Sequence, residues 1–367
     1  MYTILTLILS RPNSMLIVMR KFSVLVAILL AMVGCNKKEI PLHNFKEVAI
    51  TPVYTDAVSI RTLELMNDGA TVAFAGDGGV FGTFNTNTGK VRGNEIEYVG
   101  VQPEFRATAH TKNDFFMISV GNPALLYKTG KQGKMELVYT EVHENVFYDS
   151  MKFWNDMEGI AVGDATDGCA SIIITRDGGN TWEKLACDIV PEIKDKEAFF
   201  AASNTNIVVY GNETWIASGG ARSAILYSPD KGASWELFET PFVSGKESSG
   251  IFSIDFYDRM HGFAVGGDYV DTRLDENNKA VTEDGGRTWK IVANNDGVGY
   301  KSCVQYVPNG NANELVAVGR TGISYSKNAG QNWKKLSDEP FYTFRFLNDS
   351  VAYAAGNAII AKLTFKK

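Results

Sequence analysis

Charged side chains recur in this chain beside short apolar segments, and their types favour recognition of an anion. The basic members are Arg61, Arg106, Lys152, Arg222, Arg320 and Arg345, and the acidic members are Asp164 and Asp268. A guanidinium group presents a planar fork of N–H donors that fits a carboxylate. If the fold brings the basic side chains together, we expect a site that grips carboxylates or acidic protein segments.

Two of the acidic residues also permit a second chemistry. Glycoside hydrolysis needs a pair of carboxyl groups about 5–10 Å apart, and Asp164 and Asp268 are the candidates. The chain lacks a GxSxG motif, a Rossmann fingerprint and a P-loop, and it has no CxxC or HExxH motif that would indicate zinc. We therefore expect no catalytic residue, no metal and no cofactor, and we keep a glycoside hydrolase or glycan-binding protein as the alternative.

Composition narrows the class of protein further. Hydrophobic residues make up 45% of the 367 residues and charged residues 21%, which is typical of a folded globular chain. The net charge of -6 argues against a nucleic-acid partner, because that function needs a basic surface. The 35 glycines against 10 prolines favour many short strands joined by tight turns.

Four repeated turns organise the second half of the chain. Residues 175–182, 228–235 and 282–289 share the order Ser or Thr, any residue, Asp, any residue, Gly, any residue, Ser or Thr, Trp. Residues 326–333 keep this order with Asn in two places. The key residues are Asp177, Trp182, Asp230, Trp235, Asp284, Trp289, Asn328 and Trp333. The almost equal spacing indicates a structural repeat.

A second repeated feature covers more of the chain. A short apolar strand that ends in glycine occurs seven times, at Gly76, Gly121, Gly163, Gly219, Gly266, Gly319 and Gly356. An alternating segment precedes each one, at 59–65, 104–110, 150–155, 198–203, 252–257, 303–307 and 342–346. Each unit predicts a four-stranded antiparallel meander. Seven such units predict an all-β, seven-bladed β-propeller.

The two ends of the repeat region predict closure of the ring. After Gly356 only one strand remains, so the last blade lacks its fourth strand. Residues 45–52 resemble a fourth strand and are expected to complete that blade, which would remove the open sheet edges. The predicted propeller therefore spans residues 44–367, and we expect a monomer.

The repeated turns have a structural explanation. An Asp carboxylate accepts hydrogen bonds from the backbone N–H groups of its own turn, and Asn328 accepts at least one such bond. The Trp that follows packs between blades and removes a large apolar area from water. We therefore expect no catalysis from Asp177, Asp230 or Asp284.

These turns resemble the Asp-boxes, or BNR repeats, of sialidases, some endoglucanases, sortilin-type receptors and the photosystem II stability/assembly factor family. The order of apolar strand, Asp turn and Trp strand over seven units is most similar to the last family. This resemblance implies a non-catalytic scaffold that binds a protein partner, with a basic patch of inner-strand arginines matched here by Arg61, Arg106 and Arg345. It also implies that the Asp turns lie opposite the binding face.

Propeller topology places the candidate residues near one mouth of the central channel. Arg61 and Arg106 begin inner strands at equivalent positions, and Lys152 and Arg345 lie in two other inner strands. Asp164, Arg222, Asp268 and Arg320 follow the second strands of their blades. The prediction is a polar funnel, and the alternative is that these charges pair with one another and plug the channel.

The N-terminus has the pattern of a lipoprotein signal. Arg20 and Lys21 precede a twelve-residue apolar run, which is too short for a mature membrane span. The run ends at residues 32–35 in a sequence similar to the bacterial lipobox, which predicts lipidation of Cys35. An ordinary secretory signal or an uncleaved anchor is the alternative.

The predicted boundaries are an upstream extension at 1–18, a signal peptide at 19–34 and a tether at 35–43. A single lipid anchor would hold the chain at a membrane of the bacterial cell envelope, at the outer membrane or the periplasmic face.

The remaining cysteines predict one possible disulfide. Cys169 and Cys187 flank the first Asp turn symmetrically, so we expect them to face each other across an antiparallel pair. An oxidising compartment would permit a disulfide, and the alternative is two packed thiols. Cys303 lies in a predicted inner strand and is expected to be a small buried residue.

Overall fold

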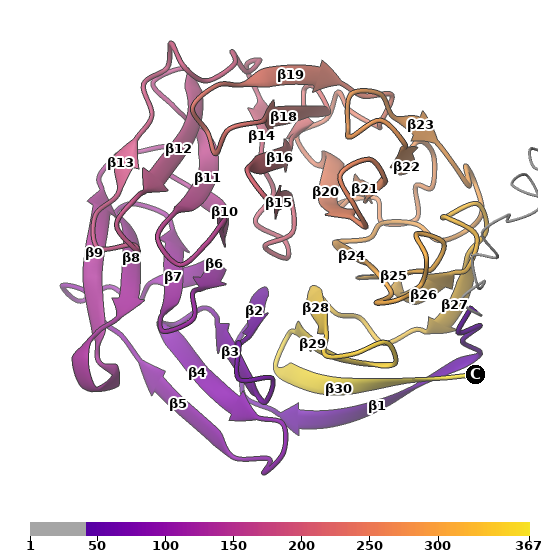
Figure 1. Cartoon of the computed structure of the whole chain (residues 1–367), viewed down its shortest axis with the longest axis horizontal. Helices are drawn as coiled ribbons and strands as arrows, with labels where there is room; N and C mark the ends of the chain where they lie inside the picture. Colours follow the sequence, from indigo (N-terminus) through magenta and orange to yellow (C-terminus); the bar gives the residue numbers. More distant parts are fainter. Residues whose placement is uncertain (1–41) are drawn as a thin grey trace, which may run out of the picture. The chain divides into compact units, whose positions relative to one another are not determined.

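The computed structural model describes residues 42–367, which form a ring of seven four-stranded antiparallel blades (Figure 1). Within these residues, the 3-10 helix η1 (Lys131–Gly133) is the only helix. The prediction of an all-β, seven-bladed propeller is confirmed. The predicted extension at 1–18, signal peptide at 19–34 and lipidated Cys35 lie outside the described residues.

Each blade runs from an inner strand beside the channel to an outer strand at the rim. The first three blades are β2 (Thr62–Leu65), β3 (Thr71–Ala75), β4 (Val80–Asn85) and β5 (Val91–Glu95); β6 (Glu104–His110), β7 (Phe115–Val120), β8 (Ala124–Thr129) and β9 (Met135–Glu141); and β10 (Tyr148–Phe153), β11 (Gly159–Thr166), β12 (Cys169–Thr175) and β13 (Glu183–Lys184). The next three are β15 (Ile207–Tyr210), β16 (Glu213–Ala217), β18 (Ala224–Ser228) and β19 (Glu236–Glu239); β20 (Ser249–Phe256), β21 (Gly262–Asp268), β22 (Lys279–Thr282) and β23 (Lys290–Ile291); and β24 (Cys303–Tyr306), β25 (Leu315–Gly319), β26 (Gly322–Ser326) and β27 (Lys334–Ser337). Two short strands, β14 (Glu197–Ala198) and β17 (Gly219–Gly220), extend the fifth blade beyond β20.

The seventh blade joins the two ends of the described chain. It contains β28 (Thr343–Phe346), β29 (Val351–Gly356), β30 (Ile359–Lys366) and β1 (Glu47–Tyr54). β1 pairs antiparallel with β30 from Glu47 opposite Lys366 to Tyr54 opposite Ile360. Figure 1 shows the two strands side by side at the edge of the ring. The predicted closure by residues near 45–52 is thus present, and the blade has no open edge at this point.

The apolar strands are buried on both faces because each blade is packed between two neighbours. In β12, every residue from Cys169 to Thr175 is buried, including the run Ile172, Ile173 and Ile174. Branched side chains suit a pleated surface that is covered on both sides. The hydrophobic core is therefore divided into clusters that lie between adjacent blades.

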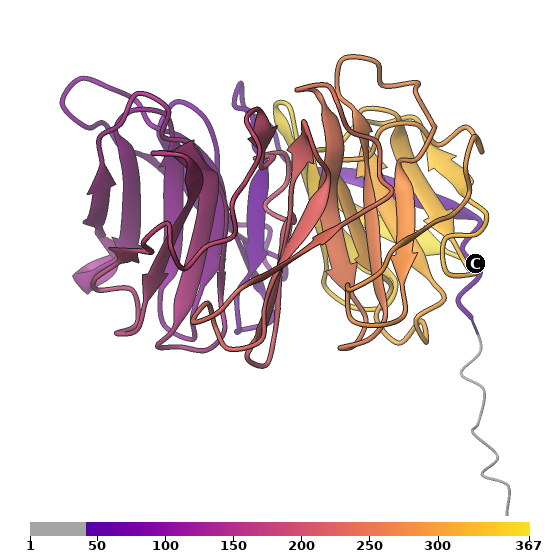
Figure 2. The same ribbon diagram turned by 90° about the horizontal axis from the view of Figure 1, so that it is seen from above.

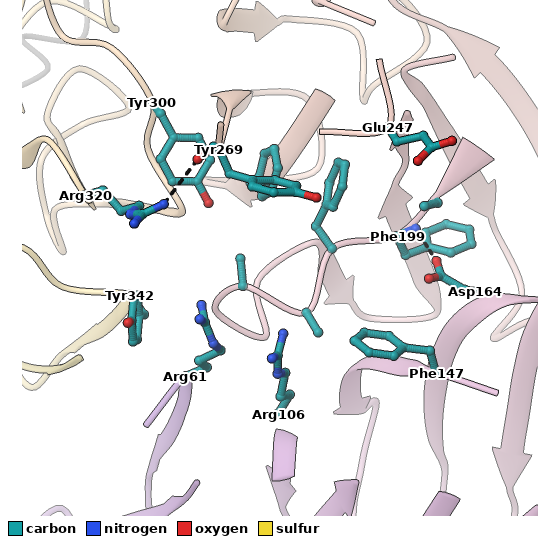
Figure 3. A pocket seen from close by; sticks show the side chains of 15 residues that line it. Arg61, Arg106, Phe147, Asp164, Phe199, Glu247, Tyr269, Tyr300, Arg320 and Tyr342 are labelled. Carbon is teal, nitrogen blue, oxygen red and sulfur yellow. Dashed lines mark hydrogen bonds between the residues drawn. The ribbon is translucent and has the colours of Figure 1, made fainter. Parts of the chain in front are cut away.

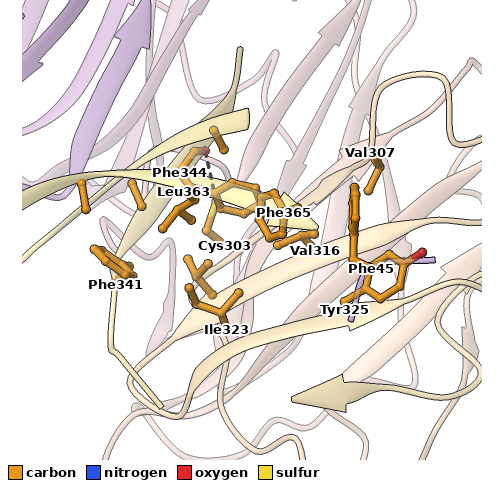
Figure 4. Close-up of a cluster of buried hydrophobic side chains, with 14 residues drawn as sticks. Phe45, Cys303, Val307, Val316, Ile323, Tyr325, Phe341, Phe344, Leu363 and Phe365 are labelled. Atoms are coloured by element: carbon orange, nitrogen blue, oxygen red, sulfur yellow. Dashed lines mark hydrogen bonds between the residues drawn. The ribbon is translucent and has the colours of Figure 1, made fainter. Parts of the chain in front are cut away.

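One of these clusters joins the closing strand to its neighbours (Figure 4). Phe45 is 2% exposed, and its ring centroid lies 5.1 Å from that of Tyr325 and 5.2 Å from that of Phe365. Cys303 is a free, fully buried cysteine of the same cluster. Residues from the start and end of the described chain thus share one apolar core.

The inner strand of the fourth blade differs from the prediction. The alternating segment at 198–203 was expected to be this strand, but the structure places β15 at Ile207–Tyr210. Residues 199–206 are instead a buried non-strand segment, which we call the plug. The alternation is misleading because the plug is covered on all sides, so its apolar residues do not mark one face of a sheet.

The plug crosses the channel and bonds to the inner strands of other blades. The side-chain amide of Asn204 donates to Thr108 O at 2.6 Å and to Glu64 Oε1 at 3.2 Å, and its oxygen accepts from the N–H of Met151 at 2.9 Å. These contacts reach the first three blades.

The residues on either side of Asn204 reach the remaining three. The carbonyl of Thr205 accepts from the N–H of Ile254 at 2.8 Å in the fifth blade. Ser203 donates to Ser302 O at 2.6 Å in the sixth blade and accepts from Thr343 Oγ1 at 2.9 Å in the seventh. Three consecutive plug residues are therefore bonded to all six other blades.

The ring has two faces that carry different loops (Figure 2). The mouth face carries the loops from each fourth strand to the next inner strand and from each second strand to the third. The opposite face, which we call the turn face, carries the Asp turns, because these join third strands to fourth strands. The plug closes the channel between the two faces.

Candidate functional site

The mouth face opens into a cavity of about 530 Å³, which we call the bowl. Four of the predicted binding residues line it, namely Arg61, Arg106, Asp164 and Arg320. Its floor is formed by residues 198–202, at the start of the plug. Figure 3 shows Arg61 and Arg106 side by side, with Arg320 across the cavity from them. The polar funnel expected at the channel mouth is therefore formed by half of the proposed set.

Arg61 is the least compensated cation in the bowl. It immediately precedes β2, and its guanidinium carbon lies 4.1 Å from the centre of the Tyr342 ring. Its Nε is buried and has no hydrogen-bond partner among the described residues. Burial and the neighbouring charge of Arg106 lower the pKa of Arg61. A buried donor without an acceptor favours an anionic ligand at this point.

A bulge turns Arg106 toward the bowl. The register of β6 against β7 shifts between Phe105 and Ala107, so Arg106 is the extra residue of the strand. Bulges of this kind redirect a side chain at the edge of a sheet. The Arg106 guanidinium bonds to Glu104 Oε1, at 2.7 Å from Nε and 2.6 Å from Nη2, and lies 5.7 Å from the Phe147 ring centre.

The far wall of the bowl is aromatic. Phe200 and Phe252 stack with ring centroids 3.9 Å apart. Tyr269 meets Phe252 edge-on at 6.2 Å, and Tyr300 does so at 4.9 Å. The cation Arg320 contacts this aromatic wall, because its Nη1 donates to the carbonyl of Tyr269 at 3.2 Å. The bowl therefore has a cationic half and an aromatic half, which suits an anion attached to an apolar group.

Two carboxylates lie where the bowl meets the plug. Asp164 Oδ1 accepts from the N–H of Phe199 at 2.7 Å, and burial raises the pKa of Asp164 to about 7. Asp149 is fully buried, and its pKa is raised by burial and by the charge of Asp164, with a smaller opposing effect from Arg106. Asp164 therefore contacts the plug, and both carboxyl groups hold a proton more strongly than an exposed Asp does.

Lys152 and Arg345 do not line the bowl, which corrects their predicted place. They meet around Glu64, three residues after Arg61 and so about 10 Å deeper along the strand direction. Lys152 Nζ lies 2.9 Å from Glu64 Oε1, and Arg345 Nη2 lies 3.8 Å from the same atom. His110 Nδ1 lies 3.2 Å from Glu64 Oε2. For Lys152 and Arg345 the alternative to a polar funnel is therefore the correct interpretation, because their charges are paired inside the channel.

Arg222 and Asp268 are also placed outside the bowl lining. Arg222 bonds to the buried Glu197, with Nη2 2.8 Å from its Oε2. The carboxylate of Asp268 accepts from the N–H groups of Val270 at 2.9 Å and Asp271 at 3.2 Å. The pair proposed for glycoside hydrolysis, Asp164 and Asp268, is therefore not brought together in the bowl.

The Asp turns use their side chains internally on the turn face. Asp284 accepts from the N–H of Thr288 at 2.9 Å and from its hydroxyl at 2.6 Å. Asn328 accepts from the N–H of Asn332 at 3.0 Å. The same pattern holds at Asp177 and Asp230.

The tryptophans of these turns pack beside them. The indoles of Trp235, Trp289 and Trp333 each donate to the turn glycine carbonyl at 3.0–3.1 Å, whereas the Trp182 nitrogen is buried without a partner.

Cys169 and Cys187 form a disulfide. They were expected to face each other across an antiparallel pair, but the β12–β13 ladder contains only Ile173 opposite Lys184 and Ile174 opposite Glu183. The bridge therefore fixes the chain beyond the end of β13. Within residues 42–367, no group of three His, Cys, Asp or Glu side chains is placed to hold a metal ion. No helix in this range is long and apolar enough to cross a membrane.

The aromatic half of the bowl was missed by the sequence reasoning. The position of a residue within its blade does carry a signal. Phe252 in β20, Asp149 in β10 and Arg106 in β6 are each the extra residue of a bulge in an inner strand. Tyr342 precedes β28 as Arg61 precedes β2. Comparing this one position across the blades would have identified several bowl residues. Tyr269 and Tyr300 lie in loops and carry no such signal.

Fold and site together define a β-propeller with a cationic and aromatic cavity at one channel mouth. No protein-family model and no curated protein sequence matches the chain. Among solved structures it is similar to YCF48 bound to a D1 peptide, with a TM-score of 0.63 and 13% identity over 90% of this chain and 100% of that chain.

Two further solved structures have a similar fold. YCF48 from Cyanidioschyzon merolae has a TM-score of 0.62 at 12% identity, over 88% of this chain and 99% of that chain. The RRP9 WD40 repeats have a TM-score of 0.61 at 10% identity, over 89% of this chain and 100% of that chain. At these identities the similarity shows a shared propeller fold.

Proposed function

We propose that this chain is a non-catalytic binding protein whose bowl receives an anionic segment of a protein partner. The observation that carries the proposal is the Arg61 side chain, whose buried Nε lacks an acceptor beside a second cation, Arg106. A carboxylate placed between the two guanidinium groups would supply the missing acceptor and offset their mutual repulsion. The similar propeller that was solved with a bound peptide supports a peptide as the ligand.

Exposed apolar residues favour a macromolecular partner over a small anion. Val99, Val142 and Val270 are 87%, 76% and 75% exposed. All three belong to loops of the mouth face, between β5 and β6, between β9 and β10, and between β21 and β22. Exposed apolar side chains around a polar cavity are typical of a protein-binding surface.

The proposal includes the cellular setting inferred from the sequence. The segment ending at Cys35 would anchor the protein by lipid to the bacterial cell envelope, and the propeller would act there as a binding or assembly scaffold. Membership in the Asp-box group, with similarity to the assembly-factor family, is part of the same proposal. Globomycin treatment of cells that express the full chain, with precursor accumulation as the expected result, tests the anchor.

The bowl is tested with a double variant that keeps side-chain size. In Arg61→Gln and Arg106→Gln together, both charges are lost, so binding of a fluorescein-labelled acidic peptide should weaken about tenfold or more. Fluorescence anisotropy at low and moderate salt measures the affinity. The matched control is Arg92→Gln with Arg287→Gln, which makes the same change in net charge outside the bowl. Equal affinities for the two double variants would contradict the proposal.

A further inference from the structure

A second hollow opens beside the bowl on the mouth face. Its volume is about 460 Å³, and it lies between the loop at 245–248 and the loop that begins after β21. Ala221 and Gly245 form its small floor, and Tyr269 and Val270 form one wall. We call this hollow the side groove.

The side groove and the bowl share two lining residues. Tyr269 and Glu247 line both hollows, so a chain that leaves the bowl over Tyr269 enters the groove directly. Tyr269 is 42% exposed and Val270 is 75% exposed. These two side chains therefore present uncovered apolar surface next to the proposed anion site.

The chemistry of the groove differs from that of the bowl. The backbone of the floor is already paired, because the N–H of Gly245 donates to the carbonyl of Gly220 at 2.8 Å. The two charged residues at the border, Lys196 and Glu247, form an ion pair at 3.0 Å and offset each other. Small floor residues beside an aromatic ring and a valine suit an aliphatic side chain.

The walls of the groove are held in place by Asp268. Its carboxylate accepts from the N–H of Val270 at 2.9 Å and lies 3.2 Å from Lys246 Nζ, so it connects the loops on both sides. Asp268 is 1% exposed, so these contacts are shielded from water and hold the start of its loop. The groove is therefore formed before a ligand arrives, which reduces the entropy cost of binding.

We propose that the side groove is a subsite for an apolar side chain of the same segment whose acidic group occupies the bowl. This inference rests on the proposed function. Charge complementarity places the acidic group at Arg61 and Arg106, and the continuous wall at Tyr269 carries the chain toward Val270. The partner is thus recognised by two features at a fixed spacing, an acidic residue and an aliphatic residue.

Synthetic peptides test this spacing directly. Each fluorescein-labelled peptide carries an Asp pair, a spacer of one to five glycines and either Leu or Ser, in both chain directions. At one spacing the Leu peptide should bind about tenfold more tightly than its Ser counterpart, because a leucine side chain leaves water. Val270→Ser should abolish this preference without changing the affinity for the Ser peptide, because it removes apolar surface and adds no charge.

Met157→Ser is the matched control, because Met157 is 53% exposed between β10 and β11, on the face opposite the bowl. It should keep the full Leu preference. Equal affinity for Leu and Ser peptides at every spacing, with binding still dependent on Arg61 and Arg106, would overturn the subsite and leave the proposed function intact. Binding that does not depend on Arg61 and Arg106 would overturn both.

Discussion

The buried carboxyl groups of Asp149 and Asp164 make the stability of the fold depend on pH. Burial raises the pKa of Asp164 to about 7, and burial with the charge of Asp164 raises that of Asp149. The folded protein therefore holds protons that the unfolded chain releases near its ordinary Asp pKa of about 4. Because the folded state binds more protons between about pH 4 and 7, its stability falls as the pH rises through that range.

Asp164→Asn should remove the part of this pH dependence that Asp164 contributes. The variant keeps an oxygen that accepts from Phe199, and it removes the smaller of the two causes that raise the pKa of Asp149, whose burial is unchanged. Between pH 5 and 8, the wild type should lose about 1–2 kcal/mol more unfolding free energy than the variant. Urea unfolding followed by Trp fluorescence measures the difference, with the exposed Asp188→Asn as the control. Parallel pH profiles for wild type and Asp164→Asn would show that the carboxyl titrates normally.

The plug is the element whose role is set by tertiary contacts alone. The segment 198–203, most of which belongs to the plug, alternates like a strand in the sequence, and local propensity gives no sign that it crosses the channel. The polar run 203–206 is the informative part, because four consecutive buried polar residues need partners that a blade edge does not supply. Those partners come from distant segments, so they were not predictable from one sequence.

Asn204→Ala should destabilise the whole ring. It removes the Asn204 partner of the Thr108 carbonyl and of the Met151 N–H, and it takes one of several donors from the Glu64 carboxylate. A buried polar group that loses its partner costs about 1–3 kcal/mol. We expect a loss of about 3 kcal/mol in chemical denaturation. The exposed Asn87→Ala should change the free energy of unfolding by less than about 0.5 kcal/mol. A similarly small effect of Asn204→Ala would show that water replaces these bonds.

At the scale of the whole molecule, the sequence predicted the architecture more fully than the site. The seven glycine-ended strands and the Asp turns repeat along the chain, so blade number and ring closure followed from the period. The bowl combines one or two residues from many blades. Arg61 and Arg106 were found because they begin inner strands. Lys152 and Arg345 were wrongly placed at the mouth, because their pairing with Glu64 inside the channel joins distant segments of the chain.

Phe45→Ala tests whether the closing strand stabilises the ring as one unit. Phe45 is 2% exposed between Tyr325 and Phe365, so its removal leaves a cavity where the chain ends meet. We expect a loss of about 3–5 kcal/mol with a single cooperative transition in urea. Leu42→Ala, at 39% exposure, is the control. A separate early transition for the seventh blade would contradict the view that closure couples the ring.

The bonding of residues 203–205 to six inner strands also limits how this protein can evolve. Propellers gain or lose blades by duplication or deletion of a repeat, since each blade contacts only its neighbours. Here such an event would widen or narrow the channel and leave several polar atoms of one central segment without partners. A lineage carrying this segment is therefore expected to keep seven repeats.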